Sequence, residues 1–372
     1  MALPSKDIFL RSPYWVTVDQ PQLGYVLCDL RIWTGDLSAE PTLPSIKLRS
    51  SALNDITTID IAEFARDYVE VYYGTASESN AVFISYELSI YDIGADTDPA
   101  PEARVYLTGF DGYGTFQDGA NFSWYKQAMI TDNYITTYHE TAVRIPVKQN
   151  LLTGYTLKRY AAGYGGPSLT TFHAVTGLTP TENTTNMVVH VVSTFQGDYA
   201  DVVILHFNGA GDETINIKYA PCNKWGNTDI HYVNRLGATQ TLAFFGKSEV
   251  MMNSKADSYK RNLLGANGTY NVTRHQEKTY NKNGTIKIQV NSGWRREEEN
   301  DAIVELMLSE QVWILVKTAT LGNGWVPKES DTWVVPVNVK SEETLIQNKK
   351  NDKLINYTFT FDAAHDWINT VR

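Results

Sequence analysis

The sequence predicts a mainly β protein with one small helical unit near its C-terminus. Short runs rich in valine, threonine and aromatic residues recur along the chain, and several alternate in polarity as half-buried strands do. Clusters of Gly, Pro, Asp and Asn separate these runs, as turns would. With 372 residues, the chain has the length of about two to three domains. We expect an N-terminal β-sandwich, a small middle β-domain and a C-terminal α+β unit of order β-β-α-β-β-β.

The first predicted domain, residues 1–150, is a sandwich with a fibronectin-like number of strands. Asp60 and Glu63 have the spacing of a capping box and precede apolar residues on one helical face, which predicts one or two helical turns. A strand at Val69–Tyr73 should follow them. The other strand-like runs of this domain are Tyr14–Val18, Tyr25–Trp33, Val82–Ile90 and Val105–Thr108.

The second predicted domain covers residues 151–254. Residues 151–187 are rich in Gly, Thr and Asn, so we expect a connector there. The polar stretch Asn253–Asn262 should lead on to the third domain. The strand-like runs between the two are Met187–Phe195, Val202–Phe207, Thr214–Tyr219, His231–Asn234 and Thr239–Phe245.

The third predicted domain, residues 255–372, begins with a hairpin. Asn283-Gly284 is a type I′ turn signal between a strand that ends at Asn281 and a strand at residues 286–290. A helix at Glu297–Glu310 should follow, because acids fill its first turn and apolar residues recur at helical spacing. Val312–Val316, Trp333–Val339 and Leu354–Phe361 complete the unit as strands.

Two details of this third domain are specific enough to check. If the helix lies on the sheet, Ile303, Leu306 and Met307 should be buried, and Glu298 and Glu305 exposed. Proline cannot donate a ladder hydrogen bond, so Pro336 marks its strand as an edge strand or a bulge. An edge strand invites pairing with another chain. We therefore expect an interface with a neighbouring protein along Trp333, Pro336 and Val339.

The negative charge lies in the N-terminal part of the chain. Residues 1–150 hold 10 Lys and Arg against 20 Asp and Glu, whereas the remaining 222 residues hold 22 of each. This charge balance argues against a nucleic-acid surface in the N-terminal part and leaves two alternatives, a solvated acidic face or docking to a basic partner.

Neither a signal peptide nor a membrane span is evident in the sequence. We expect no disulfide between Cys28 and Cys222, and synthesis in a reducing cytoplasm.

A search for chemistry predicts no catalytic residues, no metal site and no cofactor. The Gly-rich segments at residues 109–119 and 163–166 lack the pattern of a phosphate-binding loop and are interpreted as turns. No nucleophile elbow occurs. Asp92, Asp96 and Asp98 form the best oxygen-ligand cluster; we favour a solvated loop, with a calcium clip as the alternative.

Three tryptophans next to glycines are the best candidates for surface recognition. Trp225, Trp294 and Trp325 stand in the contexts KWGN, SGWRR and NGWVP. A ring in such a loop could bind a sugar by stacking, but packing in a core or an interface is the interpretation we favour.

Several segments resemble virion structural proteins of tailed bacteriophages, especially those of marine and Bacteroidota-infecting phages. The similar segments lie in order along most of the chain. They are Ile59–Tyr68, Leu107–Gly119, Tyr232–Phe245 with the preceding Cys222, and Asn351–Phe361. The resemblance implies a tail or baseplate component that assembles with copies of itself and with other virion proteins. It carries over no active-site residue.

Three hypotheses of different classes follow. The first is a non-enzymatic virion component that acts by protein–protein assembly, without nucleic-acid or membrane binding. The second is a virion-borne module that binds a host-surface glycan through its aromatic residues. The third, a polysaccharide-degrading enzyme, lacks the repeats of a β-helix and any catalytic motif.

Overall fold

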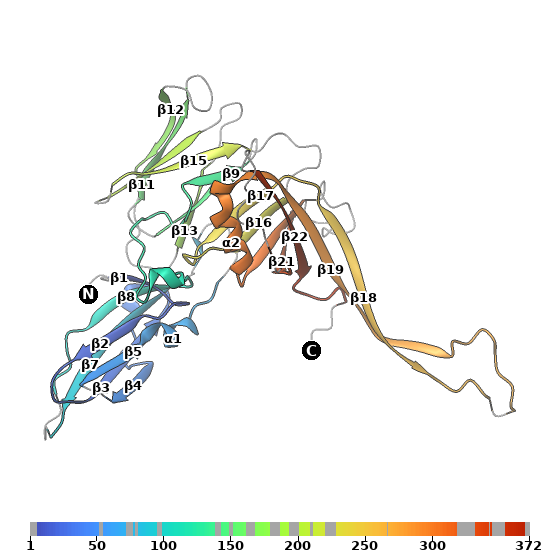
Figure 1. The fold of residues 1–372 in the computed structure, drawn as a ribbon, viewed down its shortest axis with the longest axis horizontal. Helices are drawn as coiled ribbons and strands as arrows, with labels where there is room; N and C mark the ends of the chain where they lie inside the picture. Colours follow the sequence, from blue (N-terminus) through green and yellow to red (C-terminus); the bar gives the residue numbers. More distant parts are fainter. Residues whose placement is uncertain are drawn as a thin grey trace. The chain divides into compact units, whose positions relative to one another are not determined.

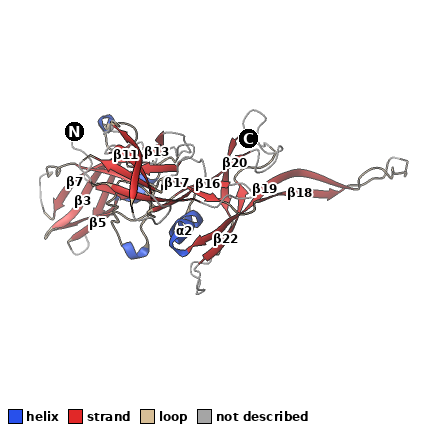
Figure 2. Ribbon diagram, turned by 90° about the horizontal axis from the view of Figure 1, so that it is seen from above, coloured by secondary structure: helices blue, strands red, loops and turns tan. Residues whose placement is uncertain are grey.

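The fold is that of a computed structural model, which is mainly β, as the sequence predicts. Strands make up most of the described chain, and the helices are few and short (Figure 2). The described residues are 6–51, 55–71, 77–78, 81–94, 99–137, 143–148, 152–160, 168–178, 187–192, 201–208, 211–219, 228–265, 267–317, 332–341, 343 and 354–368.

The chain divides into two compact units, and each consists of several chain segments. Unit 1 comprises Met1–Cys222, Tyr232–Leu242 and Asp301–Ser309. Unit 2 comprises Asn223–His231, Ala243–Asn300 and Glu310–Arg372.

A seven-stranded β-sandwich opens unit 1, in agreement with the predicted fold class. A five-stranded sheet of order β1-β8-β7-β3-β4 is one layer, and the β2-β5 ribbon is the other. Val16 and Ile59 from the ribbon pack with Cys28 and Leu88 from the larger sheet, so the core lies between the layers. The strands are β1 (Lys6–Phe9), β2 (Trp15–Asp19), β3 (Leu23–Trp33), β4 (Ile46–Ser51), β5 (Ile56–Asp60), β7 (Ala81–Asp92) and β8 (Val105–Phe110).

The predicted helical turns are present as α1 (Ile61–Arg66). Asp60 caps the helix, because its Oδ1 accepts hydrogen bonds from the backbone N–H groups of Ala62 at 3.0 Å and Tyr14 at 3.1 Å. The predicted strand Val69–Tyr73 is wrong in its described part. The backbone turns on after α1, with the N–H of Val69 bonded to the carbonyl of Arg66, and residues 72–73 lie outside the described residues. Short 3₁₀ turns occur at η1 (Leu37–Ala39) and η2 (Phe116–Asp118).

Two further sheets of unit 1 correct the predicted connector at residues 151–187. β11 (Leu152–Tyr160) and β12 (Leu169–Thr176) are strands. Gly154 serves their close approach rather than a turn, because a Cβ there would lie 2.2 Å from the carbonyl oxygen of Val175. The sheet orders are β12-β11-β14-β15-β9 and β10-β13-β6. The remaining strands are β6 (Ser77–Glu78), β9 (Tyr134–Thr137), β10 (Val143–Val147), β13 (Met187–Val192), β14 (Val202–Phe207) and β15 (Glu213–Tyr219).

A seven-stranded sheet follows, of order β17-β16-β20-β21-β22-β19-β18. The first two strands in this order belong to the predicted middle domain, and the predicted boundary at 254/255 falls inside β18. The division into residues 1–150, 151–254 and 255–372 stays a prediction. The strands are β16 (Thr228–Val233), β17 (Thr239–Phe244), β18 (Glu249–Lys260), β19 (Glu277–Arg296), β20 (Val312–Lys317), β21 (Thr332–Val339) and β22 (Leu354–Ala363).

The predicted hairpin at Asn283-Gly284 is wrong, because β19 continues through it. The turn signal is realised as a bulge instead. Asn281 has a positive φ of 50°, and the β18–β19 register shifts beside it. The side-chain Oδ1 of Asn283 accepts hydrogen bonds from the N–H groups of Gly284 at 2.8 Å and Ile368 at 3.0 Å, which fixes the bulge. The strand therefore reverses direction only at residues 261–276.

The predicted helix is present, with different ends and a different exposed face. It consists of η3 (Glu297–Glu299) and α2 (Asn300–Leu308). Ile303 and Leu306 are buried, as expected, and Met307 is half-buried. The expected exposure of Glu305 is wrong, since this residue is only 4% exposed. The reason is that Asp301–Ser309 belongs to unit 1, so the helix packs within that unit. The Glu298 side chain lies outside what the structure describes.

The prediction that Trp333–Val339 is an edge strand is also wrong. β21 lies between β20 and β22 and pairs with both. The carbonyl of Pro336 accepts a hydrogen bond from the N–H of Ala364 at 2.9 Å, so its nitrogen also points to the β22 side. β22 ends at Ala363, so the position at which Pro336 lacks an N–H donor lies beyond the last residue pair of the β21–β22 ladder. Proline is therefore tolerated in this central strand.

Candidate functional site

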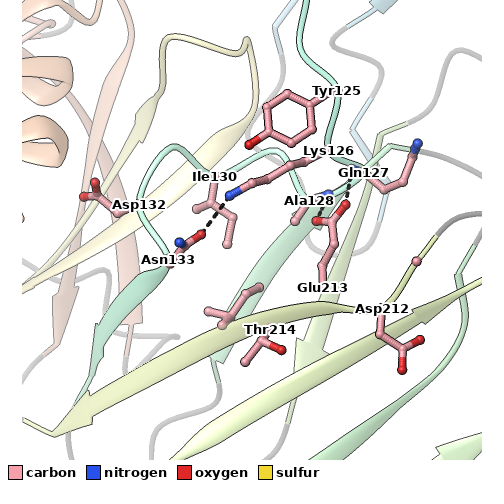
Figure 3. Close-up of a pocket in the computed structure, with 12 residues that line it drawn as sticks. Tyr125, Lys126, Gln127, Ala128, Ile130, Asp132, Asn133, Asp212, Glu213 and Thr214 are labelled. Atoms are coloured by element: carbon pink, nitrogen blue, oxygen red, sulfur yellow. Dashed lines mark hydrogen bonds between the residues drawn. The ribbon is translucent and has the colours of Figure 1, made fainter.

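A cavity of about 430 Å³ lies in unit 1, between the segment before β9 and the start of β15 (Figure 3). Glu213 joins the two sides. Its two carboxylate oxygens accept hydrogen bonds from the backbone N–H groups of Gln127 at 2.6 Å and Ala128 at 3.0 Å. Nζ of Lys126 donates a hydrogen bond to Oδ1 of Asn133 at 2.8 Å, which links two residues of the segment before β9. The lining residues are Tyr125, Lys126, Gln127, Ala128, Ile130, Asp132, Asn133, Gly211, Asp212, Glu213, Thr214 and Ile215.

The carboxylates that line this cavity do not face one another as the pair in glycoside hydrolysis does (Figure 3). That reaction needs two carboxyl groups that face each other about 5–10 Å apart. Asp132 and Asp212 point away from Glu213 (Figure 3), and both oxygens of Glu213 are bonded to backbone. Tyr125 at the rim is 82% exposed. The geometry is that of a hollow lined by both polar and apolar side chains, with an exposed ring at its edge.

A carboxylate, an imidazole and a hydroxyl stand in a row beside the cavity. Nδ1 of His206 lies 3.0 Å from Oδ1 of Asp212, and its Nε2 lies 2.7 Å from Oγ1 of Thr156. Hydrolases use the same order of groups, together with a substrate cleft and oxyanion donors. Thr156 and His206 lie on the adjacent strands β11 and β14, and neither lines the cavity. We interpret the row as a cross-strand link that orients His206. Sequence reasoning missed it because β11 was predicted to be a connector.

The most exposed part of the described chain is the outer part of the β18–β19 pair with its turn. We call residues 251–284 the arm. Figure 1 shows the arm extending beyond the other strands of its sheet. β22 pairs with β19 only from Lys287 to Arg296, and β18 is the last strand in the sheet order, so the arm is a two-stranded ribbon among the described strands.

The surface of the arm combines apolar and basic side chains. Tyr259 and Tyr280 form an edge-to-face pair across the ribbon, with ring centroids 5.7 Å apart. The arm carries six Lys and Arg against two Asp and Glu. The prediction of a polar connector at Asn253–Asn262 missed it; the two tyrosines on either side of the Gly- and Asn-rich turn are the signal that could have revealed it. The exposed apolar residues are Met251, Met252, Tyr259, Leu264, Tyr270, Val272 and Tyr280.

Of the three tryptophans singled out from the sequence, the structure describes Trp294 alone. Its side chain is 65% exposed, so it is not packed in the core of this chain; packing in an interface and stacking on a sugar stay predictions. Gly293, with φ of +72°, lies where the β19–β22 register shifts, and this bulge directs the ring outwards. Trp225 and Trp325 lie outside the described residues, and so does the side chain of Trp333. In β21, Pro336 is exposed and Val339 half-buried.

The structure describes the predicted oxygen ligands and the two cysteines only in part. Asp96 and Asp98 lie outside the described residues, and Asp92 accepts a hydrogen bond from Gln20 at 3.2 Å. Within the part of the chain that the structure describes, no group of three or more His, Cys, Asp or Glu side chains could hold a metal ion. Cys28 is buried in the sandwich core, and this burial, with a smaller contribution from the charge of Asp29, raises its thiol pKa to about 12. Cys222 lies outside the described residues.

Comparisons with known proteins leave the family open. No protein-family model matches the chain, and no curated protein matches it either. One solved structure with a match is described as "Crystal structure of CBD12 from CALX1.2". It is 12% identical, the match covers 54% of this chain and 76% of that chain, and the TM-score is 0.18. A TM-score this low carries no argument about fold or function. No helix among the described residues has the length and hydrophobicity needed to cross a membrane.

Proposed function

We propose that the chain is a non-enzymatic structural component of a tailed-bacteriophage virion, most consistent with the tail or baseplate. It acts by protein–protein assembly with copies of itself and with other virion proteins. The resemblance of the ordered segments along the chain motivates the choice of virion. The exposed arm is the single structural observation that supports assembly.

The arm supports this role on physical grounds. A two-stranded ribbon without a third strand or a covering helix is marginally stable in water. This ribbon nevertheless keeps seven large apolar side chains exposed, Val272 at 85% and Leu264 at 63% among them. Exposed apolar side chains gathered in one element indicate a protein interface. An arm of this kind gains stability when a neighbour covers it.

The protein content of purified particles tests the proposal. Phage particles from lysed host cells would be purified on a density gradient and analysed by quantitative mass spectrometry. We expect peptides of this chain in a fixed ratio to other tail proteins across the particle peak. Peptides found only in the soluble fraction would contradict a structural role.

A second candidate function is glycan recognition on the host surface, and the exposure of Trp294 favours it. A ring that is 65% exposed on a rigid strand can stack on a sugar face. Trp294→Ala should then abolish binding of the purified protein to host polysaccharide, whereas Trp367→Ala, a matched change at a 51% exposed ring, should not. If the wild-type protein binds no polysaccharide, glycan recognition has no support.

A further inference from the structure

We infer that the arm docks on the N-terminal sandwich of a second copy of this chain. This inference rests on the proposed function and names the partner of the arm. Backbone hydrogen bonds close the turn of the arm: the N–H of Gly265 bonds to the carbonyl of Thr269 at 2.9 Å, and the N–H of Arg261 to that of Gln276 at 2.9 Å. We call this end of the arm, residues 260–274, the tip.

The tip is both apolar and basic. Leu264, Tyr270 and Val272 are 63%, 62% and 85% exposed. Lys260 and Arg274 are exposed beside them. Within residues 260–274 there are three Lys and Arg and no Asp or Glu. A partner surface should therefore offer apolar contact inside a rim of acids.

One end of the N-terminal sandwich has this composition. Ile56 and Ile93 are exposed there, at 43% and 71%. Three exposed acids surround them, namely Asp19, Asp55 and Asp92. We call these five residues the acidic end.

Hydrogen bonds hold the acidic end together. Asp19 pairs with Ile56 across the β2–β5 ribbon. Gln20 bonds to both other acids: its N–H donates to the carbonyl of Asp55 at 3.2 Å, and its Nε2 donates to Oδ1 of Asp92 at 3.2 Å. The surface is thus formed before any partner arrives.

Charge complementarity selects a second copy as the occupant. Residues 1–150 hold 10 more acids than bases, whereas the arm holds four more bases than acids. Attraction between such surfaces steers association and fixes its register. Because the tip and the acidic end are different surfaces, the contact is heterologous, and repetition builds a ring or an open row of subunits. This geometry suits a part of a tail.

The test is a charge exchange in the full-length protein. Self-association would be measured by sedimentation velocity at low salt for two double variants, Lys260→Glu with Arg274→Glu and Asp19→Lys with Asp92→Lys, and for a mixture of the two. Each reversed protein alone should associate at least about tenfold more weakly, because like charges then face each other. The mixture should recover association, because both contacts between the two variants pair opposite charges: the reversed tip with the reversed end, and the native tip with the native end.

Matched controls separate this effect from general changes of charge. Lys340→Glu in unit 2 and Glu70→Lys in unit 1 reverse exposed charges outside the two surfaces and should leave association unchanged. Circular dichroism and thermal midpoints confirm that every variant folds.

Three outcomes would overturn the inference. They are a wild-type protein that stays monomeric at all concentrations, reversed sandwich acids without effect, and association that nuclease treatment abolishes. The first two leave the proposed function intact if the chain is present in purified particles, so failure of the partner and failure of the function are distinguishable.

Discussion

Glu305 is a carboxyl group that α2 places in the interior of unit 1. It is 4% exposed and accepts a hydrogen bond from the hydroxyl of Thr131. Burial raises the pKa of this carboxyl from 4.5 to about 7, with a further contribution from the charge of Asp132. The native state therefore holds a proton that the unfolded chain releases at lower pH. Sequence periodicity placed Glu305 on the exposed face, because it cannot tell which unit covers a helix.

This raised pKa makes the stability of the protein depend on pH. Between about pH 4.5 and 7 Glu305 is protonated in the native state and ionised in the unfolded state, so its contribution to the free energy of unfolding falls as the pH rises. The neutral Glu305→Gln variant should lack this loss. At pH 8 the variant should exceed wild type by on the order of 3 kcal/mol.

Urea unfolding at pH 5 and pH 8 measures the difference. Glu63→Gln, at an exposed position on α1, is the matched control and should follow wild type. An equal change with pH in wild type and Glu305→Gln would show that Glu305 is ionised in both states or hydrated in the native state.

At the scale of the element, α2 shows that two leucines of one helix differ in exposure according to what their side chains contact. Leu306 is fully buried, at 0% exposure, whereas Leu308 two positions later is 53% exposed. Leu306→Ala should lower the free energy of unfolding by about 2–5 kcal/mol through lost packing and the cavity it leaves. Leu308→Ala should cost less than about 0.5 kcal/mol, because surface changes are small. Similar losses in urea unfolding would contradict the orientation of the helix.

The strands with alternating or apolar patterns were predictable, and the errors have identifiable causes. Val202–Phe207 and Leu354–Phe361 match β14 and β22 closely because one face of each is buried. Residues 151–187 were predicted to be a connector from their Gly, Thr and Asn content, but composition does not distinguish a turn glycine from one such as Gly154, which allows two strands to approach closely. Asn283-Gly284 and Pro336 are local signals whose meaning depends on strand pairing, which one sequence does not display.

At the scale of the whole molecule, composition and pattern were enough for a mainly β fold with several sheets and a small helix. They did not reveal the arm, because its strands are exposed on both faces and lack the alternation of a half-buried sheet. The candidate surfaces follow from exposure and charge, which depend on the folded chain. Trp294, one of the three tryptophans whose sequence context made them candidates for the surface, is exposed in the structure.

The central claim is that this chain assembles into a virion through its arm. A reconstruction of the purified particle tests it most directly. Our account predicts density for several copies of the chain, with residues 251–284 of each copy covered by a neighbouring protein and the tip on the acidic end of the next copy. Particles that lack the chain, or copies whose arms extend free into solvent, would contradict it.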